Sequence, residues 1–303
     1  MAIAPRPVPQ VQSFNAKTVT PAELVEALRL AGGVIIRNFV DHPILDQIER
    51  ELRPFLAPVP PKDSNDSKGT AGVRKTDEEG NVEVFDEQFF PKQSRRATAM
   101  IEKSETSARE IMMHPLYQAV VKEYLTSYYT YWQDQERVEA VSEPYINNSI
   151  CFSIMPGATN QVLHRDDLPQ HIVHEEIEEF PKDVRSTNRE ACLGLFVAGK
   201  PATKENGATR LNKGDAFMML GSCFHGGSAN HTDDQERLIF SLFYVRGYLR
   251  QEENYFLSVD PAKVAKWPVE WQRAIGYYTS IPANGWVEHD DPRKVLKKYG
   301  ADV

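Results

Sequence analysis

The first third of the chain shows helical spacing of apolar residues between clear start and stop signals. Thr20-Pro21-Ala22-Glu23 combines a capping hydroxyl, a proline at the first helical position and a glutamate three residues after the cap, which predicts a helix start. Gly32-Gly33 ends this helix, and Val34-Ile35-Ile36 predicts a short buried strand. Asp41 begins a second predicted helix through Leu56, whose apolar residues have helical spacing: Leu45, Ile48, Leu52 and Phe55.

The pattern changes in the second half, where short apolar runs are separated by turns. Residues 149–168 predict a strand, a turn at Pro156-Gly157 and a second strand. Further strands are predicted at Cys192–Ala198, Ala216–Leu220 and Arg237–Tyr248. Helices followed by many short strands indicate a mainly β protein with peripheral helices, so we expect a β barrel or jelly roll core with helices packed outside it.

We expect a single domain over residues 1–303. Its parts are a Pro-rich arm (1–19), a helical N-terminal part (20–132), a β core (145–250) and a C-terminal helix and tail (260–303). The polar segment 58–88 is either a lid over a site or a mobile insertion, and the two readings are about even. The aromatic residues from Tyr124 to Trp132 are expected in the hydrophobic core rather than around a cofactor.

Composition restricts the classes of function. The 303 residues are 41% hydrophobic and 26% charged, which is ordinary for a chain that buries a substantial core. The formal net charge of −8 argues against nucleic acid as the main partner. We find no apolar run of membrane-spanning length, no signal peptide and no metal-type spacing among the three cysteines. We expect a cytoplasmic protein with reduced cysteines that acts on a small molecule, with a homodimer left open.

Candidate metal chemistry begins with histidines that have an acidic residue two positions later. Four fit this spacing: His164 (Asp166), His174 (Glu176), His231 (Asp233) and His289 (Asp291). Because the chain has 43 acidic residues, chance alone supplies such pairs, and context must choose among them. Only His164 follows a predicted strand and turn and still has histidines downstream. In an extended segment His164 and Asp166 point the same way, which supplies two ligands of a 2-His-1-carboxylate site for non-heme Fe(II).

A third ligand and an anion-binding residue lie further along the chain. His225 follows the predicted strand Ala216–Leu220, 225 − 166 = 59 residues after Asp166, and the next two glycines allow a backbone to come close. Arg237 begins the most apolar strand and shares a face with Ser241 by alternation. An arginine near a metal in an apolar interior predicts a dicarboxylate that chelates the metal at one end. The competing reading of Arg237 is a rim residue paired with Asp233 or Glu236.

Two other classes of function stay open from the residues alone. His171 and His174 are three apart and could share a helix face, which would suit a zinc-dependent hydrolase. This segment is acidic, however, and is typical of a solvated surface. The other alternative is a non-catalytic, metal-free β-barrel binding module in which His164 and Asp166 are only a polar pair.

Taken together, these motifs resemble the Fe(II)/2-oxoglutarate-dependent oxygenases of the phytanoyl-CoA dioxygenase family, in particular fungal members that act in secondary metabolism. The resemblance rests on six segments in family order: Gly-Gly-Val-Ile-Ile-Arg-Asn-Phe (32–39), Gln-Ser-Arg-Arg (93–96), Met-His-Pro-Leu (113–116), Glu-Asn-Gly-Ala-Thr-Arg (205–210), Lys-Gly-Asp-Ala-Phe (213–217) and His-Gly-Gly-Ser-Ala-Asn (225–230). The chain departs from the family pattern after Arg210, where the usual Pro-Gly-Ser-His stretch is missing.

The resemblance implies a double-stranded β-helix (jelly roll, cupin-like) core and a set of site residues. It places Fe(II) on His164, Asp166 and His225, and 2-oxoglutarate on Arg237 with contacts from Gln161 and Thr203. Strict alternation from His164 would put Gln161 on the other face unless the strand bends there. The implied reaction uses O2 and 2-oxoglutarate to oxidise a small molecule, by hydroxylation or by desaturation, cyclisation or endoperoxide formation.

Overall fold

The structure, a computed structural model, describes residues 9–56, 91, 93–175, 177, 179–185, 187–203, 207 and 210–303. The segment 58–88, expected to be a lid or an insertion, lies outside the described residues, as do residues 1–8 of the expected arm.

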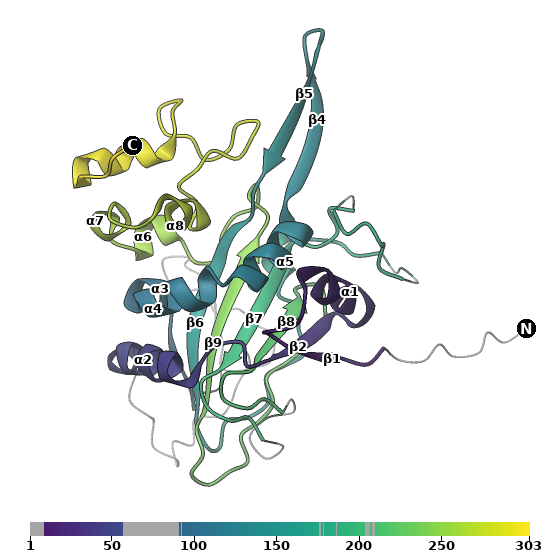
Figure 1. Ribbon diagram of the computed structural model, residues 1–303, viewed down its shortest axis with the longest axis vertical. Coiled ribbons are helices and arrows are strands. Elements are labelled where there is room, and N and C mark those ends of the chain that lie inside the picture. The colour runs from purple at the N-terminus through teal and green to yellow at the C-terminus, as the bar shows by residue number, and fades with distance from the viewer. Residues whose placement is uncertain are drawn as a thin grey trace, which may run out of the picture.

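The described strands form one large sheet and one separate ribbon (Figure 1). The strands are β1 Gln12–Asn15, β2 Gly33–Arg37, β3 Ser94–Ala97, β4 Ser127–Gln133, β5 Glu136–Ser142, β6 Tyr145–Ile154, β7 Cys192–Ala198, β8 Ala216–Leu220 and β9 Arg237–Val245. The large sheet has the order β1-β2-β8-β7-β9-β6-β3. Its first pair, β1 and β2, is parallel and the other neighbours are antiparallel.

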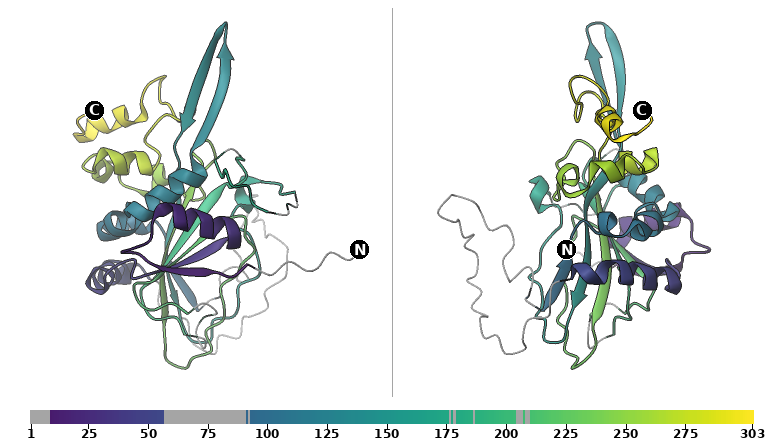
Figure 2. Two further views of the ribbon diagram at one scale, coloured as in Figure 1. Left: turned by 45° about the vertical axis from the view of Figure 1, so that its right-hand side comes forward. Right: turned by 90° about the vertical axis from the view of Figure 1, so that its left-hand side faces the viewer.

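Short helices form most of the remaining regular structure among the described residues. They are α1 Pro21–Ala31, α2 His42–Leu52, η1 Arg53–Phe55, α3 Met100–Lys103, α4 Glu105–Ser107, the π-helical η2 Ala108–Met112, α5 Pro115–Leu125, η3 Leu168–Gln170, α6 Tyr255–Ser258, α7 Pro261–Val264, α8 Val269–Ala274 and η4 Pro292–Tyr299. The right-hand view of Figure 2 shows the N-terminal helices gathered on one side of the sheet. None of the described helices is long and apolar enough to span a bilayer.

The helices cover the outer face of the sheet and form the main hydrophobic core with it. On β9, Leu238, Phe240 and Leu242 point toward this core, because every second side chain of a strand lies on the same face. Tyr117 of α5 is fully buried, and its hydroxyl lies 2.8 Å from Leu242 O and 3.0 Å from Leu193 O. One side chain therefore links a helix to two strands of the sheet.

The inner face of the sheet carries the other set of alternating residues. Ile239 of β9 packs with Ala198, Ala202 and Leu211, next to three partly buried phenylalanines: Phe152, Phe196 and Phe217. Ala202 and Leu211 form an isolated bridge opposite the sheet, and His164 and His225 form another. The layer that packs against the inner face of the sheet is therefore made of isolated bridges and loops rather than long strands. The expected mainly β, double-stranded β-helix core with peripheral helices is confirmed.

Several local predictions match the structure closely. Both hydrogen bonds of the predicted capping box at Thr20 and Glu23 are present. The predicted strands Cys192–Ala198 and Ala216–Leu220 are β7 and β8. The cysteines are free, as expected.

Other local predictions were wrong, and each has a physical cause. Gln12–Asn15, part of the expected arm, pairs with β2 as an edge strand. The predicted strand after Pro156 does not form, because residues 155–168 pair with a loop through separated bonds rather than a continuous ladder. The predicted strand from Arg237 ends at Val245. The C-terminal part (260–303), expected to be one helix and a tail, contains three short helices, α7, α8 and η4.

The prediction of a buried aromatic cluster was also wrong for most of its members. Tyr124 is buried in α5, but Tyr128, Tyr129 and Trp132 are 55%, 59% and 69% exposed. These three lie on β4, which pairs only with β5 to make a ribbon that projects from the body (Figure 1). A two-stranded ribbon has no third layer to cover both of its faces.

We expect Tyr117→Phe to lower the free energy of unfolding by about 1 kcal/mol, because it removes a buried hydroxyl that bonds strand carbonyls. Urea unfolding followed by circular dichroism would measure this change. Tyr128→Phe is the matched control, since that hydroxyl is on an exposed side chain. Equal stability of the two variants would contradict the role given to Tyr117.

Candidate metal centre

The site is built where the loop after β6 meets the loop after β8. His164 N donates to His225 O, and His225 N donates to His164 O, both at 2.9 Å. On either side, Gln161 N donates to Gly227 O at 2.8 Å and Asp166 N donates to Gly221 O at 2.9 Å. Antiparallel backbone pairing therefore brings together two segments that are far apart in the sequence.

Three side chains converge at this pairing: His164, Asp166 and His225. His164 Nε2 lies 3.5 Å from Asp166 Oδ1, and His225 Nε2 lies 3.2 Å from Asp166 Oδ2. The three ligand atoms lie within 4.8 Å of one another, and no other group of three such ligands occurs among the described residues. Metal–ligand bonds of about 2.1 Å at right angles would place the donors about 3 Å apart, so this spacing suits one ion.

The histidine tautomers follow from the second nitrogen of each ring. His164 Nδ1 lies 2.8 Å from Val162 O, and His225 Nδ1 lies 3.1 Å from Cys223 O. Because a carbonyl can only accept, each Nδ1 carries the proton, which leaves the Nε2 lone pairs facing Asp166. Both rings are thus oriented for metal binding by their own loops.

The charges and lone pairs of His164, Asp166 and His225 favour a cation between these side chains. Asp166 Oδ2 is buried and accepts no hydrogen bond within the part of the chain that the structure describes. Burial opposes protonation of His164, but Asp166 and the Val162 carbonyl outweigh it and raise the pKa of His164. Two ring lone pairs and a carboxylate directed at one point are stable with a cation between them. The residues therefore fit a divalent metal ion.

Two glycines make the close backbone approach possible. A Cβ atom on Gly226 would lie 2.9 Å from Gln161 O, and one on Gly227 would lie 2.9 Å from Gln161 Oε1. Gln161 Oε1 also accepts a hydrogen bond of 2.9 Å from Gly227 N. The expectation that Gly226-Gly227 allows close approach is confirmed, and Gln161 holds the loop that carries His225.

The buried acid Glu190, which the sequence motifs did not indicate, supports the two loops. Glu190 is fully buried and accepts hydrogen bonds from Ser222 N at 3.0 Å and Ser222 Oγ at 2.7 Å. Ser222 lies between Gly221, which binds Asp166 N, and Cys223, which binds His225 Nδ1. Burial raises the pKa of Glu190 to about 8. The sequence gives no signal for this role, because Glu190 ends a polar segment.

Arg237 lies on the inner face of β9, close to the loop that carries His225. Its Nη2 donates to Ser228 O at 2.6 Å, and a Cβ on Gly207 would lie 3.1 Å from its Nη1. Burial lowers the pKa of Arg237 to about 10. Glu236 points to the opposite face, where it binds Arg53 and Lys200, so the reading of Arg237 as a partner of Glu236 is wrong.

Two further residues, Thr203 and Ser241, lie near the same inner face of the sheet. Thr203 is partly buried and follows Ala202, which packs against Ile239 of β9. Ser241 shares the face of Arg237 but donates to Ile150 O at 3.0 Å, so its hydroxyl hydrogen is already used within the sheet.

Among the residues that the structure describes, the alternative pair His171 and His174 belongs to no group of three metal-ligating side chains. His171 is exposed, with a left-handed backbone at the end of η3, so it shares no helix face with His174. His174 Nε2 instead bonds the carboxylate of Asp167, which is fully buried and also lies 3.3 Å from Arg165 Nε. His174 therefore anchors the loop that follows Asp166.

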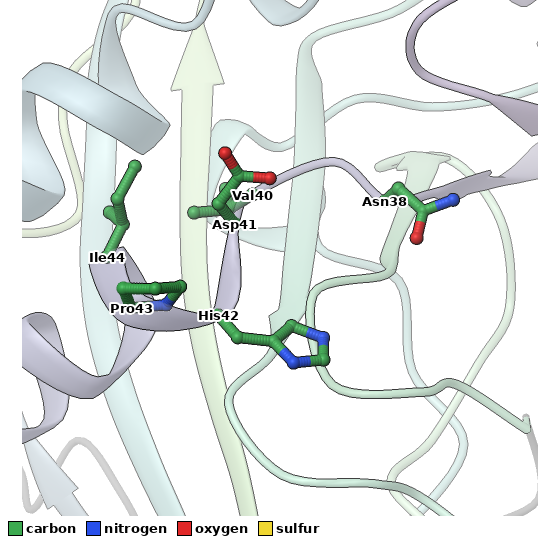
Figure 3. Close-up of a pocket in the computed structure, with 6 residues that line it drawn as sticks. All are labelled: Asn38, Val40, Asp41, His42, Pro43 and Ile44. Carbon is green, nitrogen blue, oxygen red and sulfur yellow. The ribbon is translucent and has the colours of Figure 1, made fainter.

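A separate cavity of about 400 Å³ lies at the start of α2, lined by Asn38 and residues 40–44. Figure 3 shows that the Asp41 carboxylate and the His42 ring point in different directions there. His42 Nε2 donates to Lys213 O at 2.8 Å. None of the three converging ligands lines this cavity, so it is not part of the metal centre.

Comparison with known proteins identifies the family. The sequence profile of the phytanoyl-CoA dioxygenase family, PhyH, matches residues 28–212. The dioxygenase himG of Aspergillus japonicus is 30% identical over 96% of this chain and 93% of its own. The dioxygenase peniF of Penicillium patulum is 30% identical over 93% of this chain and 90% of its own. The chain belongs to the phytanoyl-CoA dioxygenase family.

Membership confirms the class of enzyme expected from the motifs. The protein is a non-heme iron dioxygenase that uses Fe(II), 2-oxoglutarate and O2. Among solved structures, the chain is similar to HygX of Streptomyces hygroscopicus with nickel, 2-oxoglutarate and hygromycin B bound. That likeness has 12% identity and a TM-score of 0.49, and it covers 90% of this chain and 98% of HygX.

The buried acid Glu190 gives the metal centre a testable pH dependence. Its pKa rises from 4.5 to about 8 on folding, so the folded protein keeps a proton that the unfolded chain loses between these values. The stability that this group contributes is present below pH 4.5 and is lost as the pH rises through about 8. At about 1.4 kcal/mol per unit, the loss amounts to roughly 5 kcal/mol.

We expect Glu190→Gln, which is always neutral, to gain stability relative to the wild type as the pH rises from 4.5 to 8.5. Urea unfolding at several pH values would measure the difference. Glu139→Gln, at an exposed position of β5, controls for the general effect of removing a negative charge. Parallel stability curves for wild type and Glu190→Gln would contradict this assignment.

Proposed function

We propose that His164, Asp166 and His225 hold the Fe(II) of this dioxygenase. The observation that carries the proposal is the convergence of their three ligand atoms within 4.8 Å at the paired loops. Bound iron, with 2-oxoglutarate and O2, supplies the oxidising chemistry, in which 2-oxoglutarate is converted to succinate and CO2. The chain's own contribution is to fix the ring tautomers, place the carboxylate between the rings and enclose the site between two walls.

We further propose that Arg237 binds the distal carboxylate of 2-oxoglutarate. A guanidinium can donate two parallel hydrogen bonds to a carboxylate, which fixes orientation as well as charge. Its place on the inner face, bonded to Ser228 three residues after His225, supports this role. Gln161 and Thr203 are proposed to contact the same co-substrate. Gln161 lies in the loop beside Gly227, and Thr203 follows Ala202, which packs against the inner face of the sheet.

We propose that the substrate is a small molecule, namely a secondary metabolite or its precursor. The fungal dioxygenases to which this chain is similar over nearly its whole length support that class. The partly buried phenylalanines of the inner face favour a substrate with apolar surface. Hydroxylation is the proposed default outcome, with desaturation, cyclisation or endoperoxide formation as variants of the same oxidation.

We expect His164→Ala to lower Fe(II) affinity at least about 100-fold and to abolish succinate formation from 2-oxoglutarate, because one of three ligands is lost. Anaerobic titration of Fe(II) and 2-oxoglutarate, followed by the visible charge-transfer band of their complex, measures binding directly. His171→Ala is the matched control, because that ring is exposed. His174 is unsuitable, since its loss would remove one of the two partners of the buried Asp167. A normal band in His164→Ala would overturn the ligand assignment.

We expect Arg237→Gln to weaken 2-oxoglutarate binding at least about tenfold, because a charge-assisted, two-point contact is lost. Fe(II) binding measured without 2-oxoglutarate should be unchanged, which separates this effect from damage to the metal centre. Arg109→Gln, at an exposed helical position, is the control. Unaltered 2-oxoglutarate affinity in Arg237→Gln would show that another group binds the co-substrate.

A further inference from the structure

A carboxylate held near the start of β6 has no role in the chemistry described so far. Glu252 follows β9, and its backbone N donates to Asn147 Oδ1 at 2.9 Å. Its carboxylate accepts from Asn147 Nδ2 at 2.8 Å through Oε1 and from Asn148 Nδ2 at 2.7 Å through Oε2. One carboxylate is therefore held by two consecutive residues of β6.

This double clamp depends on an irregularity in the sheet. Consecutive residues of a regular strand point to opposite faces. The pairing of β6 with β9 shifts register between Ile146 and Asn148, which indicates a bulge at Asn147. The bulge allows both amide groups to reach Glu252, so the backbone of β6 is shaped around this carboxylate.

The Glu252 side chain is reached by solvent, although the residues that hold it are buried. The residue is exposed, whereas Asn147 and Asn148 are buried. Burial nevertheless raises the pKa of Glu252, and the charge of Asp166 raises it further while His164 lowers it. A carboxylate on an open convex surface would not feel such desolvation. Asn148 pairs with Phe243 of β9, which shares the face of Arg237 by alternation, so the clamp lies at the inner face of the sheet.

The hydrogen-bonding groups around Glu252 have an excess of acceptors. Asn148 is only 8% exposed, and its Oδ1 has no hydrogen-bond partner among the described residues. Its Nδ2 is used by Glu252, so the amide cannot turn without losing that bond. Within the same part of the chain, no lysine or arginine forms an ion pair with Glu252. An unused buried acceptor next to a carboxylate that has no cationic partner suits a donor that carries positive charge.

We propose that Glu252 and Asn148 form an anionic subsite that binds a protonated amine of the substrate and so positions the molecule for oxidation. This inference rests on the proposed function, because it places the subsite in the substrate cavity of the dioxygenase. Glu252 is a binding residue in this scheme, and Asn147 positions it. The co-substrate carboxylates bind elsewhere, at the metal and at Arg237.

The test uses three probes of similar size and different charge, because the natural substrate is unidentified. They are 2-phenylethylamine, 2-phenylethanol and 3-phenylpropionate. Each is added anaerobically to the wild-type protein with Fe(II) and 2-oxoglutarate, and binding is followed as a change in the charge-transfer band. We expect the amine to bind at least tenfold more tightly than the alcohol, and the carboxylate to bind more weakly than both.

We expect Glu252→Gln to weaken amine binding at least tenfold, to the level of the alcohol, while the band formed by Fe(II) and 2-oxoglutarate stays unchanged. Asn148 can turn its amide to accommodate the new side chain, since its Oδ1 is otherwise unused. Glu253→Gln is the matched control, because Glu253 binds Ala99 N instead. It should bind the amine as the wild type does.

Three results would overturn the proposal: equal binding of amine and alcohol, no amine binding in the presence of a normal band, or amine binding that is unaffected in Glu252→Gln. Failure of the band itself in the wild-type protein would instead overturn the proposed function, and this inference with it. The two failures are therefore distinguishable in a single titration series.

Discussion

The structure depends above all on the backbone pairing of two loops. The reciprocal hydrogen bonds between His164 and His225 bring the third proposed metal ligand to the first two, and Gln161 and Asp166 extend the pairing on either side. No regular strand is needed, because a few bonds between fixed segments are enough to set the ligand positions. The cost is steric: a Cβ at position 226 would lie 2.9 Å from the backbone oxygen of Gln161, and one at position 227 would displace the Gln161 side-chain oxygen.

Around this pairing the protein concentrates negative charge and acceptor groups in a low-dielectric environment. Asp166 contributes directly, Asp167 is paired with His174 behind it, and burial keeps Glu190 protonated near neutral pH. Each of these acids either holds a loop or faces the site. In the proposed metal site a divalent cation would offset the charge of the converging side chains, which would couple metal binding to the order of both loops. In the further proposal, the Glu252 carboxylate and the unused Asn148 Oδ1 accept hydrogen bonds from a protonated amine of the substrate.

The sequence predicted what local patterning controls. The capping box at Thr20 and the strands β7 and β8 depend on neighbouring residues and were predicted with their bounds. The convergence of His164, Asp166 and His225 was predictable because spacing and turns constrain it. Glu190 and the clamp of Asn147 and Asn148 on Glu252 were not, since they depend on burial and on a bulge. The exposed face of β4 was missed because aromatic residues give the same pattern whether or not a third layer covers them.

The most direct test of the central claim is a crystal structure of the anaerobic protein with Mn(II) in place of Fe(II), located by anomalous scattering. The account predicts one strong peak between His164 Nε2, His225 Nε2 and the Asp166 carboxylate, with both Nδ1 atoms still bonded to backbone carbonyls. A peak at His171 and His174, or a His225 ring turned away from the ion, would contradict it.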